Sequence, residues 1–231
     1  MPATMLSDRS VLRLSGEDVR AFLDGLVTNR LSDEAPVWAG LLTPQGKTIA
    51  DFLVWPHEGD WLIDVSADDA DDLVKRLSMY RLRRKIEIVP DETLAVHWSA
   101  DGADGHADPR HPAMGRRWIA SQSEAARGYD AHRLRLNVCE GAELTDLLWL
   151  ETNARELNGV AFDKGCFVGQ ENTARMNWRG KINRRLFVVD GEREGARAAY
   201  PDLGLSVVHA RIDAVPDEAL MPDWLAKAIA S

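Results

Sequence analysis

The sequence contains few cysteines and no long apolar segment. Only Cys139 and Cys166 occur among 231 residues, they lie 27 positions apart, and no C-x-x-C pair is present. Two such thiols are too few for a disulfide framework or for a metal centre built by one chain. Because no run of 18 apolar residues and no apolar N-terminal segment occurs, we expect no membrane contact. A reducing compartment is expected, either the cytosol or, in a eukaryote, the mitochondrial matrix.

Positive charge is also scarce, which argues against nucleic acid as a partner. The chain has 28 Lys and Arg against 37 Asp and Glu, a formal net charge of -9. Binding of nucleic acid or of an anionic membrane needs an extended basic face, so neither partner is expected.

One basic stretch departs from this balance, because no acid occurs between Glu171 and Asp190. Its five cations are Arg175, Arg179, Lys181, Arg184 and Arg185. Arg175, Arg179 and Lys181 form a candidate anion patch, since guanidinium groups bind carboxylates and phosphates in a planar fork. The alternative is a solvated face whose charges pair with acids elsewhere.

Apolar periodicity predicts an α+β fold. Strands are expected at 11–14, 48–55, 61–65, 85–89, 94–98, 184–190 and 207–212, and helices at 19–26, 66–81 and 224–229. Strands that bracket helices, with hairpins present, favour a largely antiparallel sheet. Residues 101–111 are rich in Gly, Asp and Pro, which predicts an exposed loop, and Pro112 stands where a calcium loop needs its terminal Glu.

The most distinctive segment is Phe162-Asp-Lys-Gly-Cys-Phe-Val-Gly-Gln-Glu171. Gly165 and Gly169 permit a positive φ, so the loop can turn tightly and present Cys166. Lys164 lies two residues before the thiol, and its ammonium would lower the thiol pKa if it reached the sulfur. The alternative is a buried structural cysteine, because unpaired cysteines are commonly small core residues.

The octapeptide KGCFVGQE, residues 164–171, resembles the K-G-C-[YF]-x-G-Q-E signature of the YgfZ family. These proteins are folate-binding relatives of the glycine-cleavage T protein and support iron-sulfur enzymes. Residues 22–29, 41–47, 82–87 and 158–163 resemble other segments of the family, so the likeness covers about residues 8–190. The resemblance implies a T-protein-like fold of two intertwined α+β domains with largely antiparallel sheets.

The implied domain organisation divides the chain into three parts. Residues 1–45 and 128–183 would form a first, discontinuous folate-binding subdomain that carries the cysteine loop. Residues 46–127 would form a ferredoxin-like second subdomain. Residues 184–231 would be a shortened remnant of the family's C-terminal β-barrel.

The resemblance also implies a tetrahydrofolate site. Asp51 is similar to the acid that faces the pterin ring, where a carboxylate accepts hydrogen bonds from ring nitrogens. Arg133 is similar to the arginine that meets the folate glutamate, and Glu151 and Asn153 match the family's E-x-N. A strand end for Asp51 and a surface ion pair for Arg133 are the alternatives.

The function implied is that of a tetrahydrofolate-binding accessory protein for the assembly or repair of iron-sulfur enzymes, rather than a stand-alone enzyme. Cys166 would supply the reactive sulfur, Lys164 would tune it, and Gln170 and Glu171 would order the loop or contact a partner. Because one thiolate cannot hold a whole cluster, cluster-assembly proteins are expected partners besides folate.

Two other functions remain open. The first is a tetrahydrofolate-dependent aminomethyl or one-carbon transferase, in which Asp51 acts in proton transfer and Cys166 is dispensable. The second is a folate-dependent thiol redox factor.

Overall fold

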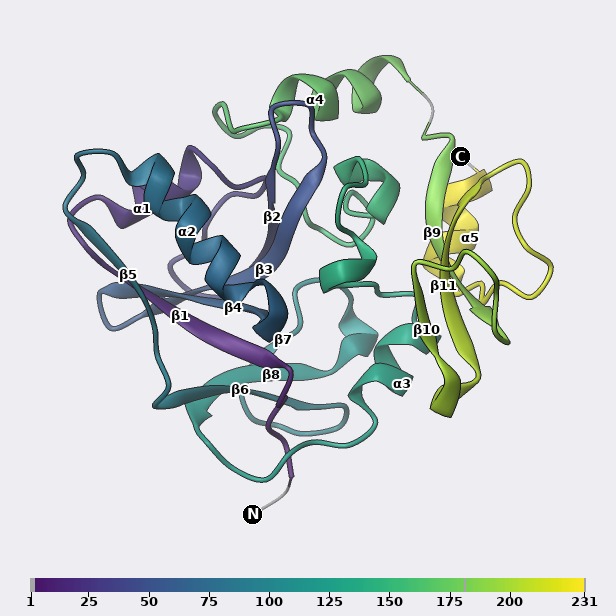
Figure 1. Cartoon of the computed structure of the whole chain (residues 1–231), viewed down its shortest axis with the longest axis horizontal. Coiled ribbons are helices and arrows are strands. Elements are labelled where there is room, and N and C mark those ends of the chain that lie inside the picture. The colour runs from purple at the N-terminus through teal and green to yellow at the C-terminus, as the bar shows by residue number, and fades with distance from the viewer. Residues whose placement is uncertain (1–2, 181, 231) are drawn as a thin grey trace.

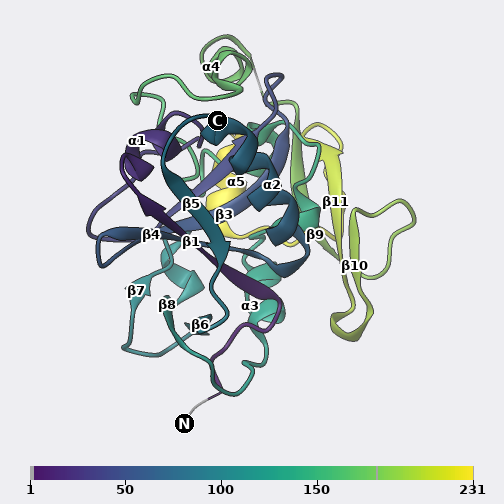
Figure 2. The same ribbon diagram turned by 60° about the vertical axis from the view of Figure 1, so that its left-hand side comes forward.

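The computed structural model describes residues 3–180 and 182–230, which form three antiparallel sheets (Figure 1). The largest sheet has the strand order β2-β3-β4-β1-β5. Its strands are β1 (Arg9–Gly16), β2 (Val37–Leu42), β3 (Thr48–His57), β4 (Asp60–Ser66) and β5 (Ile86–Pro90). Helices α1 (Val19–Asp24) and α2 (Ala70–Arg81) cover one face of this sheet and enclose an apolar core with it (Figures 1 and 2).

Two smaller sheets pack around the other side of the molecule. One has the order β6-β8-β7, from β6 (Leu94–Ser99), β7 (His106–Ala107) and β8 (Arg116–Ser121). The other has the order β10-β11-β9, from β9 (Arg184–Asp190), β10 (Ala198–Tyr200) and β11 (Leu205–Arg211). Helix α5 (Asp223–Ala230) packs on this last sheet through Leu225, which is fully buried with Phe187 and Val189.

The remaining helical elements connect the sheets. They are α3 (Tyr129–Arg135), α4 (Gln170–Arg179), and the short 3-10 helices η3 (Gly141–Glu143) and η4 (Trp149–Thr152), with further 3-10 turns at 67–69, 112–114 and 201–203. Helix α4 lies at the periphery, remote from the N-terminus (Figure 1). Among the described residues, no helix combines the length and the apolar composition needed to cross a membrane.

The expected α+β class with antiparallel sheets is confirmed, and β3 and β4 form the predicted hairpin. The bounds of the predicted strands lie at most two residues from those of β1, β5, β6, β9 and β11. The domain division stays a prediction. The largest sheet combines strands from both 1–45 and 46–127.

The expectation of an exposed loop at 101–111 fits most of residues 101–107 but is wrong for Asp108 and Arg110. Asp108 is 3% exposed and Arg110 is 1% exposed, and this segment also carries β7. The reason is mutual pairing, because the Arg110 guanidinium donates to both carboxylate oxygens of Asp108, at 2.9 and 2.7 Å. Composition predicted a loop, but it could not reveal that two of its charges satisfy each other in the interior.

A cluster of paired charges lies at the centre of the protein and is called here the central ion cluster. Its members are Arg9, Asp64, Asp108, Arg110, Arg117, Arg133, Glu140 and Glu143, all at most 8% exposed. Four arginines therefore face four acids. The residues come from β1, β4, β8, α3, η3 and the connections beside them, so the cluster joins elements of two sheets.

Glu140 is the hub of the central ion cluster. Its carboxylate lies 2.5 Å from Arg110, 3.6 Å from Arg133 and 3.8 Å from Arg9. Burial alone raises the pKa of Glu140, but these arginines outweigh burial and hold its pKa well below the usual value. Charges buried in this way stabilise a fold only as long as every partner is present.

We therefore predict that Glu140→Gln lowers the free energy of unfolding by about 3–5 kcal/mol, because it leaves buried arginines uncompensated. Urea unfolding at pH 7 measures this, with Glu87→Gln as a control on an exposed carboxylate of β5. The folded pKa of Glu140 lies below its unfolded value, so its contribution is present above about pH 4.3 and is lost on further acidification. The two variants should accordingly converge in acid. Equal stability of both at pH 7 would contradict this role for the cluster.

Candidate functional site

The two cysteines lie in opposite environments. Cys139 is 2% exposed within the main apolar core, and burial raises the pKa of its thiol well above the usual value. Cys166 is exposed, in the loop that leads into α4 (Figure 1). The alternative of a structural core cysteine therefore describes Cys139, whereas Cys166 is accessible to a reagent or partner.

The chain before Cys166 is fastened to the segment that follows α1. The Lys164 ammonium donates hydrogen bonds to the backbone carbonyls of Val27, at 2.8 Å, and Asn29, at 2.9 Å. The Thr28 hydroxyl donates to the carbonyl of Gly159 at 2.7 Å. Desolvation by burial lowers the pKa of Lys164 to about 8, against the opposing effect of Asp24.

The chain after Cys166 is fastened to the turn between β2 and β3. Phe167 is 7% exposed and packs into the main core. Gly169 has φ +84°, and a Cβ there would lie 2.6 Å from the carbonyl oxygen of Thr43. The Asn172 amide donates to the carbonyl of Gln45 at 2.9 Å. The thiol is thus presented between two fixed segments.

The motif residues play partly different roles from those expected. The left-handed backbone that glycine permits is adopted at Gly169 but not at Gly165. Lys164 contacts carbonyl oxygens and lies 5.5 Å from the centre of the Phe167 ring, which indicates an anchoring role, while tuning of the thiol stays a prediction. Gln170 begins α4, and the exposed Glu171 occupies its first turn, where a carboxylate is favourable.

Arg133 uses its whole hydrogen-bonding capacity inside the protein. An arginine has five N–H donors. Nε donates to Asp130, Nη1 to Glu143 and to the carbonyl of Val138, and Nη2 to Glu143 and to the hydroxyl of Tyr200, at 2.8 to 3.2 Å. No donor remains for the glutamate of a folate, and the side chain is 4% exposed.

Asp51 is likewise an internal residue, located on β3. One carboxylate oxygen accepts from the Trp38 indole at 2.8 Å and the other from the Gly141 amide at 2.7 Å. The residue is 1% exposed. Burial raises its pKa, while Arg9 opposes this shift. The carboxyl joins β3 to η3, and in this arrangement neither Asp51 nor Arg133 offers a free group to a pterin or a glutamate.

Glu151 and Asn153 connect η4 to the sheet of β9–β11. The Asn153 amide donates to the Leu186 carbonyl at 3.0 Å, and its oxygen accepts from Arg185 at 2.9 Å. The Glu151 carboxylate lies 3.2 Å from Nε2 of His209 on β11. Their cofactor roles stay predictions, while their contacts hold elements together.

The predicted anion patch lies only partly within the described residues. Arg175 is exposed on α4 and donates to the Asn172 side chain at 2.9 Å. Lys181 and the side chain of Arg179 lie outside the described residues. Arg185 of the same basic stretch pairs with Glu156 at 2.9 Å, but it is 2% exposed and so belongs to neither a free anion patch nor a solvated face. Within residues 3–180 and 182–230, no group of three or more His, Cys, Asp or Glu is arranged to hold a metal.

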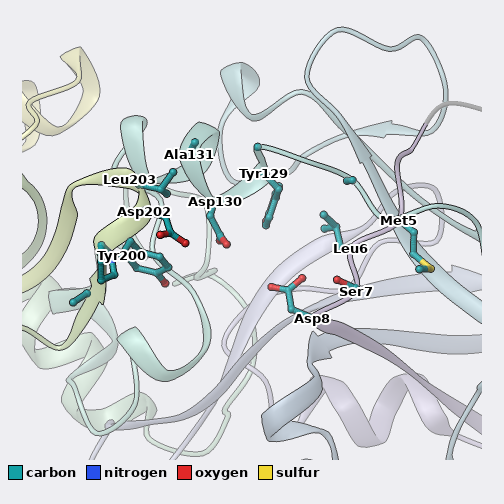
Figure 3. Close-up of a pocket in the computed structure, with 14 residues that line it drawn as sticks. Met5, Leu6, Ser7, Asp8, Tyr129, Asp130, Ala131, Tyr200, Asp202 and Leu203 are labelled. Carbon is teal, nitrogen blue, oxygen red and sulfur yellow. The ribbon is translucent and has the colours of Figure 1, made fainter.

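Figure 3 shows a cavity of about 480 Å³. It lies beside the central ion cluster, because its lining residues Tyr129 and Asp130 accept hydrogen bonds from Arg110 and Arg133. Its walls come from the chain before β1, the start of α3 and the turn after β10. Asp8, Asp130 and Asp202 line it together with Tyr129 and Tyr200, and its lining contains no Lys or Arg. Asp130 pairs with Arg133 at 2.8 Å from outside the lining, and Asp8 and Asp202 add two further acids. This acidic lining disfavours the polyanionic tail of a folate.

Sequence reasoning missed Glu140 and Glu143, which organise this region. The available signal was their three-residue spacing, since they form a reciprocal capping box around η3. The roles of Asp108 and Arg110 carried no comparable signal, because a Gly- and Asp-rich composition resembles that of an exposed loop.

The chain is similar in sequence to proteins that are named as iron-sulfur cluster assembly factors. It is 33% identical over 233 residues to the human protein named "Iron-sulfur cluster assembly factor IBA57, mitochondrial", covering 80% of this chain and 65% of the relative. It is 31% identical over 245 residues to the IBA57 homolog of Neurospora crassa, covering 86% of this chain and 55% of the relative. The chain thus spans less than two thirds of either relative. No protein-family model matches it.

The fold has a counterpart among solved structures. The glycine cleavage system aminomethyltransferase T from Bartonella henselae superposes with a TM-score of 0.67, over 91% of this chain and 79% of that one, at 11% identity. At this identity the likeness concerns the fold alone. The chain is therefore similar over at least 80% of its length to mitochondrial iron-sulfur cluster assembly factors, and it has the α+β fold of an aminomethyltransferase T protein.

Proposed function

We propose that this chain is an accessory factor in the assembly or repair of iron-sulfur proteins, with the Cys166 thiol as its working group. The observation that carries the proposal is the presentation of Cys166. It is the exposed one of two cysteines, and the segments on both sides are fixed to the body of the protein. The names of the relatives, which are iron-sulfur cluster assembly factors, support the same function.

The number of ligands that an iron-sulfur cluster needs limits the role that a single thiol can have. Iron-sulfur clusters are commonly held by four cysteine thiolates, so one thiolate does not hold a cluster by itself. We therefore propose that Cys166 supplies one ligand to a cluster in transit and that a cluster-assembly protein supplies the others. The cluster is cargo here, and Lys164 and Phe167 keep the thiol in a constant position while partners exchange.

The compartment follows from the same proposal. The matched relatives are named as mitochondrial proteins. In a eukaryotic cell we propose the mitochondrial matrix as the site of action, and in a bacterium the cytosol. Both compartments keep Cys166 reduced, which ligation of iron requires.

Tetrahydrofolate is the cofactor that the resemblance implies, but the residues do not fit it in this arrangement. Arg133 has no free donor, Asp51 is 1% exposed, and the neighbouring cavity is acidic. We therefore propose that the accessory function involves no folate held by Asp51 and Arg133. The rival aminomethyltransferase needs such a folate, and only the likeness of fold favours it.

We predict that Cys166→Ser abolishes support of a cluster-dependent enzyme, because an alcohol does not replace a thiolate as an iron ligand. The measurement is the activity of that enzyme in cells that lack their own copy of this protein. Cys139→Ala serves as the control, since it removes the buried thiol and should retain support. Full activity with Cys166→Ser would refute the proposed function.

We also predict that tetrahydrofolate does not saturate the purified chain below about 1 mM, corresponding to a binding free energy of about -4 kcal/mol. Tryptophan fluorescence measures this well, because the Trp38 indole donates directly to Asp51. Asp51→Asn is the matched control. Saturable quenching in the wild type that is lost in Asp51→Asn would show a folate site, and aminomethyl transfer in the same sample would favour the rival enzyme.

A further inference from the structure

We infer that the outer face of α4 is the docking surface for an acidic partner protein that is served by Cys166. This inference rests on the proposed function and adds where the partner binds and what its surface must offer. It depends on three observations: an exposed tryptophan, its position relative to the cysteine loop, and the local excess of positive charge.

Trp178 is exceptional among the eight tryptophans of the chain. It is 75% exposed, whereas Trp38, Trp55, Trp61, Trp98 and Trp149 are each at most 7% exposed. Helix α4 directs Thr173 and Met176 towards the body of the protein, where Thr173 is 2% exposed and Met176 packs on the core. An indole exposed to this extent adds little burial to the isolated chain, but tryptophan is enriched among the residues that dominate binding energy at interfaces.

Glu171, Arg175 and Trp178 form one outward stripe on α4, called here the α4 outer stripe. They are exposed and occupy positions i, i+4 and i+7, which coincide on one side of a helix. The stripe begins five residues after Cys166. The Trp178 ring also contacts Phe162, four residues before Cys166, edge-on at 6.4 Å between ring centres. The segment that carries Cys166 is therefore adjacent to the stripe at both of its ends, at Phe162 through Trp178 and at Glu171 through the chain itself.

The charge around the α4 outer stripe selects the partner. Arg175 is exposed, and no acid occurs in residues 172–189. The exposed Lys47 follows Gln45 and Gly46, which contact Asn172 of α4. Glu171 is the acid of the stripe itself, and Asp163 nearby pairs with Arg30 at 3.2 Å. A partner with carboxylates around an apolar pocket for the indole fits this surface, because the cations here attract it. The rest of the chain is acidic and would repel such a partner.

A second copy of this chain is a poorer fit. A two-fold dimer through the α4 outer stripe would join two copies of one surface, on which two cations, Arg175 and Lys47, stand against one acid, Glu171, so the contact would leave cations without acidic partners. A head-to-tail contact could satisfy the charges, but it would produce a ring or a filament rather than a dimer. Charge complementarity thus favours a different, acidic protein.

The test separates docking from chemistry by a titration. The purified 231-residue chain is added to an anaerobic extract of cells lacking their own copy, supplied with iron and sulfide, and reactivation of one cluster-dependent dehydratase is followed. Trp178→Ala should raise the half-saturating concentration of the chain about tenfold or more while the plateau activity is retained. Trp178→Phe should recover part of the loss, and Leu82→Ala, at an 85% exposed leucine elsewhere, should behave as wild type.

Salt and charge supply a second arm. Added KCl should raise the half-saturating concentration of the wild type, and it should do so less for Arg175→Gln, because exposed charge pairs are screened. A Trp178→Ala curve that matches that of Leu82→Ala overturns the docking surface. So does a wild-type chain that is dimeric by light scattering and becomes monomeric with Trp178→Ala.

The proposed function fails by a different result, which is full reactivation by Cys166→Ser. Loss of the plateau with Cys166→Ser and an unchanged curve for Trp178→Ala would remove only the docking surface. Thermal unfolding of each variant checks the fold, and Trp178→Phe keeps the test decisive if Trp178→Ala unfolds.

Discussion

The central ion cluster is the interaction on which the rest of this structure depends. Glu140 pairs with Arg9, Arg110 and Arg133. Glu143 beside it accepts hydrogen bonds from Arg133 and from the hydroxyl of Tyr200 on β10. The cluster and its tyrosine thereby link all three sheets. Because buried charges tolerate no missing partner, this arrangement specifies how the sheets sit relative to one another.

The position of the cysteine loop follows from that arrangement. After Glu143 the chain runs along the turn between β2 and β3, where the Leu147 carbonyl accepts from the Thr48 amide at 2.7 Å and the Trp149 amide donates to Gly46 at 3.1 Å. The same turn supports Gly169 and Asn172, which hold the far side of the loop. A path of packed backbone therefore extends from the buried charges to the exposed thiol.

The fold of a T protein is retained while its expected ligand groups have other uses. Asp51 and Arg133 occupy the positions that the resemblance assigns to folate, yet their oxygens and donors are taken up by Trp38, Gly141, Glu143 and Tyr200. The exposed thiol lies elsewhere, at Cys166 in the peripheral loop before α4. A shared fold therefore does not carry a shared site, because a site depends on which polar groups remain free.

The sequence by itself determined the α+β class, the β3–β4 hairpin and the distinctive cysteine segment, because period, turn residues and glycines act locally. It did not determine the environments of Asp51, Arg133 or Asp108. Asp51 meets Gly141 at a separation of 90 residues, and Arg133 meets Tyr200 at a separation of 67. Such distant partners decide whether a charged group is free to bind a ligand or is already hydrogen-bonded within the protein, and only the tertiary structure brings them together.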